Sequence, residues 1–231
     1  MKGTNMKELL LYHGSPNIVK HPTLDKSKEY ADFGAGFYCS RNSETGKEWA
    51  CSYSRDGYLN KYELNIDGLR ILDLTSKKYT TLHWLAVLAE NRKFKIASPL
   101  MRTAIIGLKK NFHIDTDKYD VIVGYRADDS YYSFIRAFMN NEISLEQLYN
   151  SLDRTKAGRQ YVIKSEKALD RIEFIGFEPV SSVEYYFKRL RKDNKARELY
   201  DDFVSVEDKS GLFIREFILR EVHEDDPRLQ R

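Results

Sequence analysis

Two short segments near the N-terminus place chemically useful side chains at the ends of two expected strands. Residues 9–12, Leu-Leu-Leu-Tyr, predict a strand that ends in His13-Gly14-Ser15. Residues 32–38, Asp-Phe-Gly-Ala-Gly-Phe-Tyr, predict a glycine-rich turn that leads into a second strand. An imidazole can bond sugar hydroxyls, glycine lets a ligand approach the backbone, and a tyrosine ring can stack on a planar ring. These residues favour a site for a polar heterocycle that carries a ribose.

The composition is that of a soluble protein, with 42% hydrophobic and 32% charged residues in 231 positions. This length suits one large domain, or one domain with an appendage. We expect no membrane helix, because no run of 18 apolar residues occurs, and no secretory signal. Cys39 and Cys51 are expected to be reduced thiols in a cytoplasmic protein, and no Cys/His spacing suggests zinc. A net charge of +3 argues only weakly for nucleic acid.

The apolar pattern predicts alternating strands and helices as far as Pro179. Expected strands lie near residues 7–13, 36–40, 61–66, 69–74, 119–124, 161–164 and 171–179, and expected helices near 43–54, 80–91, 98–112, 128–140, 145–152 and 165–169.

The pattern changes after Pro179. A charged helix is expected over 181–201, with an apolar face formed by Val183, Tyr186, Phe187 and Leu190, and a second helix over 207–221. We therefore expect a domain over residues 7–180, a helical C-terminal appendage over 181–222 and a disordered tail over 223–231.

The order of these motifs resembles the NAD-binding core of the ADP-ribosyltransferases. Leu-Tyr-His-Gly-Ser followed by Phe-Gly-x-Gly-x-Tyr is similar to the histidine–tyrosine branch, which includes diphtheria toxin and the poly(ADP-ribose) polymerases. The resemblance is closer to an uncharacterised bacterial family of that superfamily, and it covers about residues 7–180. The further segments that carry it are Asn91-Arg92, Ala127-Asp128-Asp129 and the stretch from Gln160 to Ser165.

The resemblance implies an α+β fold in which two small antiparallel sheets, with inserted helices, surround an NAD cleft. His13 would bond the ribose of NAD, the backbone of Gly14 would hold the nicotinamide amide, and Ser15 could serve a ribose hydroxyl. Gly36 would belong to the turn beside the ligand, and Tyr38 would stack on the nicotinamide.

Position 49 matches a second aromatic of the polymerases, eleven residues after the tyrosine. Trp49 could therefore close the other side of the nicotinamide ring, or it could be a plain core residue. The implied reaction is NAD-dependent mono-ADP-ribosyl transfer with release of nicotinamide.

Gln160 departs from the superfamily pattern, in which a glutamate begins this late strand. A glutamine can hold the ribose 2′-hydroxyl, but it has no charge and cannot act as a general base. With His13, Tyr38 and Gln160 as the central residues, Gln160→Glu is expected to raise nicotinamide release, since the added charge favours an oxocarbenium-like state. The opposite result would mean that another carboxylate already supplies the charge. The available ones are Asp128 and Asp129, which could instead cap a helix, and Glu166.

The acceptor of the ADP-ribose could be a protein, a nucleic acid or a small molecule. By analogy alone, the role would be that of a bacterial toxin, effector or phage-defence protein, with an antitoxin or immunity partner. Two alternatives stay open. One is a non-catalytic module that binds NAD or a nucleotide, which Gln160 favours. The other is a nucleic-acid-binding protein whose basic helix, around Lys188 to Lys192, contacts phosphate.

Overall fold

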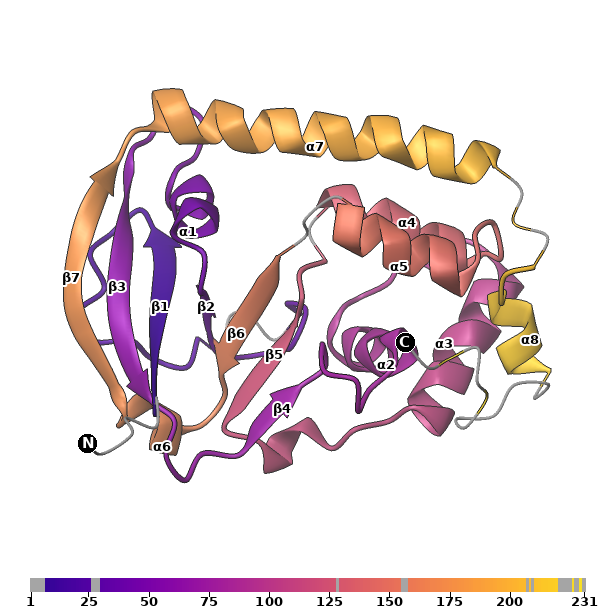
Figure 1. Cartoon of the computed structure of the whole chain (residues 1–231), viewed down its shortest axis with the longest axis horizontal. Helices are drawn as coiled ribbons and strands as arrows, with labels where there is room; N and C mark the ends of the chain where they lie inside the picture. The colour runs from indigo at the N-terminus through magenta and orange to yellow at the C-terminus, as the bar shows by residue number, and fades with distance from the viewer. Residues whose placement is uncertain are drawn as a thin grey trace, which may run out of the picture.

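The computed structural model describes residues 7–25, 30–127, 129–154, 158–206, 208, 210–219, 226 and 229. Within them the chain forms an α+β fold with one seven-stranded mixed sheet and eight α-helices (Figure 1). The strands are β1 (Glu8–Ser15), β2 (Phe37–Ser40), β3 (Gly57–Asn65), β4 (Ile71–Asp73), β5 (Val121–Tyr125), β6 (Arg159–Ile163) and β7 (Ile172–Val180). The helices are α1 (Ser43–Ala50), α2 (Thr81–Asn91), α3 (Pro99–Asn111), α4 (Asp129–Met139), α5 (Leu145–Arg154), α6 (Glu166–Leu169), α7 (Ser182–Ser205) and α8 (Ile214–Ile218).

The strands join into one sheet, in the order β4-β5-β6-β2-β1-β3-β7, where two separate antiparallel sheets were expected. One neighbouring pair, β4 and β5, is parallel, because the connection between them passes through α2 and α3. The join between β1 and β2 is narrow: among the described residues their register holds one pair, Tyr12 with Ser40. On its other side β1 pairs with β3 along its whole length. The two halves of the sheet are therefore only loosely tied at this join.

Alternating side chains of β5 and β6 separate the two main hydrophobic cores. Ile122 and Val162 face the helices and lie in the buried cluster formed with α2, α3, α4 and α5. Their neighbours Val121 and Ile163 face the opposite side and pack with residues of β1, β2 and β3. Successive side chains of a strand point to opposite faces of the sheet. Each face of these two strands therefore packs against its own hydrophobic core.

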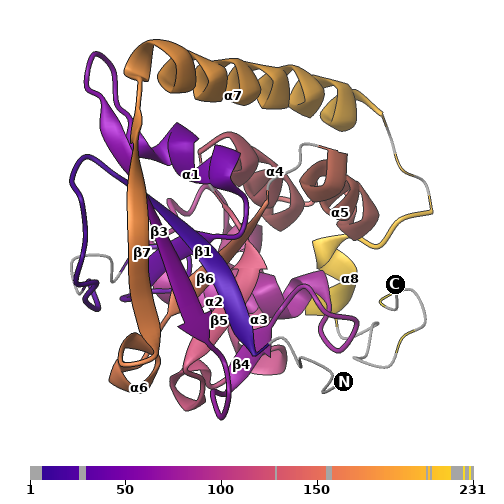
Figure 2. The ribbon, with the colours of Figure 1, turned by 60° about the vertical axis from the view of Figure 1, so that its left-hand side comes forward.

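The C-terminal helices complete the larger core. Figures 1 and 2 show α7 crossing over α1, α4 and α5, and it contacts all three. Leu212, Ile214 and Phe217 are buried in the same cluster as α2 to α5. Residues of the expected appendage thus fill the core of the expected domain. Of the expected tail, only Asp226 and the buried Leu229 are described, so disorder there lies outside the described residues.

The prediction of a buried apolar face on α7 is largely wrong. Val183, Phe187 and Leu190 are exposed, with 77%, 43% and 37% of their surface accessible. The helix instead uses aromatic and polar groups near its start, where Tyr186 packs beside the small cluster around Ala50. Among the described residues, no helix combines the length and the apolar character needed to cross a lipid bilayer.

Three expected boundaries also differ. The helix expected over 43–54 ends at Ala50, because Ser52 and Arg55 pair in a tight turn that leads into β3. The helix after Pro179 extends to Ser205. Of the helix expected over 207–221, the structure shows α8, while 207, 209, 220 and 221 lie outside the described residues.

Glycine at position 14 allows α1 to lie directly on β1. A Cβ atom there would lie 2.0 Å from the carbonyl oxygen of Gly46 and 2.6 Å from the backbone nitrogen of Ala50. Both neighbours are helix backbone and cannot move aside as a side chain would. The absence of a side chain at Gly14 therefore sets the distance between α1 and β1.

We predict that Gly14→Ala lowers the free energy of unfolding by about 1–3 kcal/mol, because the added methyl group overpacks the contact with α1. Gly107→Ala in α3 is the matched control, since no atom of the described residues lies within 4 Å of the place where its methyl group would be added. That change should raise stability by about 0.5–1 kcal/mol, the usual gain of alanine over glycine inside a helix. Chemical denaturation measures both. Equal stability of the two variants would contradict the packing argument.

Candidate functional site

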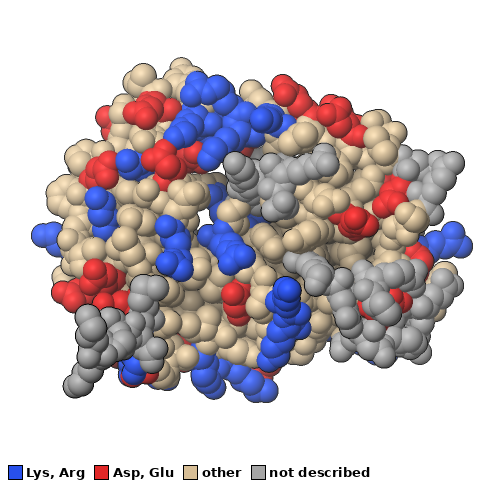
Figure 3. Space-filling view, in the orientation of Figure 1, with Lys and Arg blue, Asp and Glu red and all other residues tan. Residues whose placement is uncertain are grey.

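A cavity of about 360 Å³ opens at the narrow join between β1 and β2. Its walls come from β1, β2, β6 and α1, together with the loops that precede β2 and follow β5. Five of the residues predicted from the sequence line it: His13, Gly14, Tyr38, Trp49 and Gln160. Figure 3 shows a hollow below α7 with Lys and Arg side chains around it and over the first half of that helix.

His13 ties the two strands together at the cavity. Its Nδ1 atom lies 2.7 Å from the carbonyl oxygen of Tyr38. A carbonyl only accepts hydrogen bonds, so Nδ1 carries a proton and donates. The ring also packs on Phe37, with centroids 4.5 Å apart. A side chain therefore supplements the backbone pairing where that pairing is weakest.

The hydroxyl of Tyr38 is engaged in holding the glycine-rich turn. It donates to the carbonyl of Gly34 at 2.7 Å and accepts from the backbone nitrogen of Phe33 at 3.1 Å. Gly34 has a φ of 70°, a conformation that suits glycine. Burial raises the pKa of the Tyr38 phenol well above its usual value, so the group stays neutral. The ring of Tyr38 is thus fixed as one wall of the cavity.

A partly buried lysine holds the same turn from the other side. The Nζ atom of Lys164 donates to the carbonyls of Phe33 at 2.6 Å and Ala35 at 2.7 Å. Burial lowers the pKa of Lys164. Tyr38 and Lys164 together fix the turn that carries Asp32 into the cavity.

Gln160 lies at the start of β6 and is 9% exposed. Its Nε2 atom donates to Oδ2 of Asp32 at 2.5 Å. Asp32 also accepts from the backbone nitrogen of Ala127 at 2.9 Å, and its Oδ1 pairs with Nη1 of Arg92 at 3.0 Å. Arg92 donates in turn to the carbonyl of Ala127. We call Gln160, Asp32, Arg92 and Ala127 the Asp32 network.

Sequence reasoning missed the role of Asp32, although this residue begins the glycine-rich segment. An acidic residue directly before such a turn is a signal that could have been weighed. Arg92, considered as part of the Asn91-Arg92 pair, is placed in the Asp32 network, and its guanidinium lies 4.6 Å from the ring centroid of Tyr132. Its contacts are those of a residue that orients a carboxylate.

Trp49 is not a plain core residue, since it is 44% exposed and lines the cavity. Two guanidinium groups lie over its ring, at 4.3 Å for Arg126 and 5.1 Å for Arg189. Such cation–π contacts orient an arginine over the face of an aromatic ring. Arg126 also lines the cavity, and no sequence pattern pointed to it.

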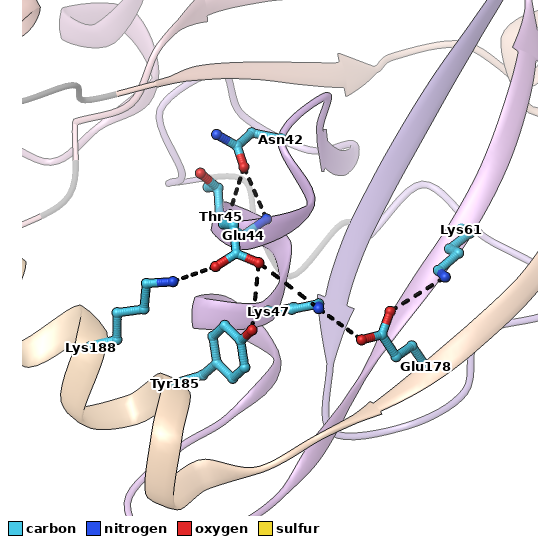
Figure 4. Close-up of polar contacts among 8 residues, drawn as sticks. All are labelled: Asn42, Glu44, Thr45, Lys47, Lys61, Glu178, Tyr185 and Lys188. Atoms are coloured by element: carbon cyan, nitrogen blue, oxygen red, sulfur yellow. Dashed lines mark hydrogen bonds and ion pairs between the residues drawn. The ribbon is translucent and has the colours of Figure 1, made fainter.

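The α1 wall is held from two sides (Figure 4). At the start of the helix, Oδ1 of Asn42 accepts from the backbone nitrogen of Glu44 at 2.9 Å. Glu44 pairs with Lys188 of α7, a contact that lowers the pKa of Glu44. On the sheet side, Lys47 pairs with Glu178 of β7 at 2.7 Å. The cavity-facing side of α1 is thus positioned by both α7 and the sheet.

Two predicted residues do not line the cavity. The Oγ atom of Ser15 accepts from the backbone nitrogen of Asn17 at 3.2 Å, which is a turn contact. A Cβ atom on Gly36 would lie 2.7 Å from the carbonyl of Ile163, so glycine there lets the turn approach β6. Both residues therefore stabilise the fold outside the cavity lining.

Of the carboxylates considered from the sequence, one can be placed relative to Gln160. Glu166 lies on α6, beyond the opposite end of β6, and does not line the cavity. Asp128 and the side chain of Asp129 lie outside the described residues. Within the part of the chain that is described, no cluster of His, Cys, Asp and Glu suits a metal ion. Cys39 and Cys51 are both buried thiols.

Comparison with known proteins gives a family and no function. No curated protein and no solved structure shows significant similarity to this chain. Residues 9–174 match a family described as "Protein of unknown function (DUF3990)". The match runs from β1 into β7, so it includes every strand that lines the cavity, and it ends before α7. Because it spans well over half of the sequence, the chain belongs to the DUF3990 family.

Proposed function

We propose that this protein transfers ADP-ribose from NAD to an acceptor and releases nicotinamide. One observation carries the proposal: His13, Tyr38 and Gln160, far apart in sequence, lie around one cavity. They come from β1, β2 and β6, which are neighbours in the sheet. These are the three positions that the resemblance to ADP-ribosyltransferases assigns to the reaction.

The size and lining of the cavity support a small planar ligand. Small-molecule sites usually enclose about 300–1,000 Å³, and a volume near 360 Å³ suits the nicotinamide–ribose half of NAD. The fixed ring of Tyr38 offers a stacking surface. His13 would form a hydrogen bond with one ribose hydroxyl, and Gln160 would hold a second one.

The reaction breaks the bond between ribose C1′ and the nicotinamide nitrogen. Both electrons of that bond leave with nicotinamide, which becomes neutral. The acceptor atom then forms a new bond to C1′ and loses its proton; when water is the acceptor, the products are ADP-ribose, nicotinamide and a proton. A site that grips both the leaving ring and the ribose favours the oxocarbenium-like transition state over the ground state.

Arg126 is suited to the pyrophosphate of NAD. It lies at the cavity wall and stacks on Trp49, so its guanidinium is oriented without being neutralised by that contact. Trp49 as the second side of a nicotinamide sandwich stays a prediction. The position of Arg126 over the indole favours a different role, in which Trp49 supports the group that binds phosphate.

The first test incubates the purified protein with NAD labelled in its ADP-ribose part, with and without cell lysate. We expect nicotinamide to be released and label to appear in the protein, nucleic-acid or small-molecule fraction that contains the acceptor. NAD binding by calorimetry without nicotinamide release in any mixture would instead identify a non-catalytic binding module.

We predict that His13→Ala lowers the rate of nicotinamide release by about tenfold or more, the usual cost of one lost hydrogen bond in a transition state. Stability should fall by about 1 kcal/mol, because the bond to the Tyr38 carbonyl is also lost. His113→Ala is the control, since this exposed histidine pairs with Glu90 outside the cavity. Wild-type turnover in His13→Ala would remove this residue from the reaction.

Two variants of Tyr38 separate the contribution of its ring from the contribution of its hydroxyl. Tyr38→Phe keeps the ring and should retain NAD affinity, while stability drops by about 1 kcal/mol because the turn loses its two hydroxyl contacts. Tyr38→Ala should weaken NAD binding by about 1–3 kcal/mol, the scale of aromatic stacking. Calorimetry and thermal unfolding report the two effects. Equal NAD affinity in both variants would exclude stacking on Tyr38.

A further inference from the structure

The orientation of the Gln160 side chain is determined by its partner. The carboxylate of Asp32 can only accept hydrogen bonds, so the group that lies 2.5 Å from its Oδ2 is the amide nitrogen of Gln160. The amide oxygen of Gln160 consequently points away from Asp32. Gln160 is 9% exposed and lines the cavity. Asp32 therefore fixes which end of the amide a ligand can meet.

Asp32 places a negative charge beside Gln160 in the cavity lining. Its side chain is 13% exposed, lines the cavity, and accepts from three groups: Gln160, the backbone nitrogen of Ala127, and Arg92. Arg92 sits on Oδ1, whereas Gln160 is bound to Oδ2. The ion pair of Asp32 with Arg92 thus has its negative end toward Gln160.

We propose that Asp32 and Gln160 together perform the task of a single glutamate. Gln160 presents an acceptor oxygen to a ribose hydroxyl of NAD, and Asp32 contributes the negative charge that stabilises the ribosyl cation. Asp32 forms no bond in the reaction; it positions Gln160 and supplies charge. This inference rests on the proposed function, and it assigns the charge to a residue from the glycine-rich segment rather than to Asp128, Asp129 or Glu166.

The arrangement explains why a glutamine occupies position 160. A glutamate there would place a second carboxylate against Oδ2 of Asp32, at the distance now spanned by a hydrogen bond. Two carboxylates this close cannot both ionise, and they would either share a proton or separate. The sequence-based expectation for Gln160→Glu is therefore reversed: the variant should be slower than the wild type.

The test compares Asp32→Asn, Gln160→Glu and the double variant that carries both changes. The readouts are kcat for nicotinamide release, NAD affinity by calorimetry, and the melting temperature. Asp32→Asn should lower kcat about 100-fold, the scale of one lost electrostatic group, with NAD affinity changed about threefold or less. Gln160→Glu should also lower kcat. The double variant moves the single charge to position 160, and it should regain about tenfold or more over Asp32→Asn.

The control is Asp115→Asn, because Asp115 pairs with Lys118 on the surface, outside the cavity. It should retain wild-type kcat. The proposal is overturned if Gln160→Glu raises kcat, if Asp32→Asn retains wild-type kcat, or if the double variant is no faster than Asp32→Asn. Gln160→Glu preserves the size of the side chain, so its rate decides the question even if Asp32→Asn does not fold. A wild-type protein that binds NAD yet releases no nicotinamide refutes the proposed function itself, and this inference with it.

Discussion

The weak join between β1 and β2 is the constraint on which the site depends. Among the described residues, the ladder between these two strands holds one registered pair, Tyr12 with Ser40. Residues of both strands beside this short ladder line the cavity. The hydrogen bond from His13 to the Tyr38 carbonyl then holds the two halves at a fixed distance. His13, which we propose binds the ligand, thus also connects the two strands.

Local patterns in the sequence predicted most of the elements and the residues of the site that lie next to a motif. The short apolar runs of β5 and β6 and the periodicity of α2 to α5 identify strands and helices because each element buries one side, or all sides, in a core. His13, Tyr38 and Gln160 were predicted as candidate site residues because their segments carry a recognisable order, and they line one cavity. The single sheet was not foreseen, since the pairing of β2 with both β1 and β6 joins residues 28 and at least 120 positions apart.

Long-range polar contacts account for the rest of what the sequence could not show. Asp32 meets Gln160 across 128 residues and Ala127 across 95, so neither partner can be inferred from spacing. Arg126 reaches Trp49 only because α1 lies close against β1, which depends on Gly14 having no side chain. The charges of the cavity are therefore a property of the tertiary structure. The apolar residues of α7 led to a wrong prediction of its buried face, because this helix packs through long-range polar pairs such as Lys188 with Glu44.

α7 also has a mechanical consequence. It starts directly after β7, on the side of the join that contains β1, β3 and β7, and it runs across to α4 and α5 beside the other half (Figure 2). Lys192 is anchored to the buried Glu48 of α1 at 2.5 Å, and Ala196 is buried in the helical core. The helix therefore connects the two halves of the fold across the weak join. Because the family match ends at residue 174, the helix that spans the join lies outside the part of the chain that the family model covers.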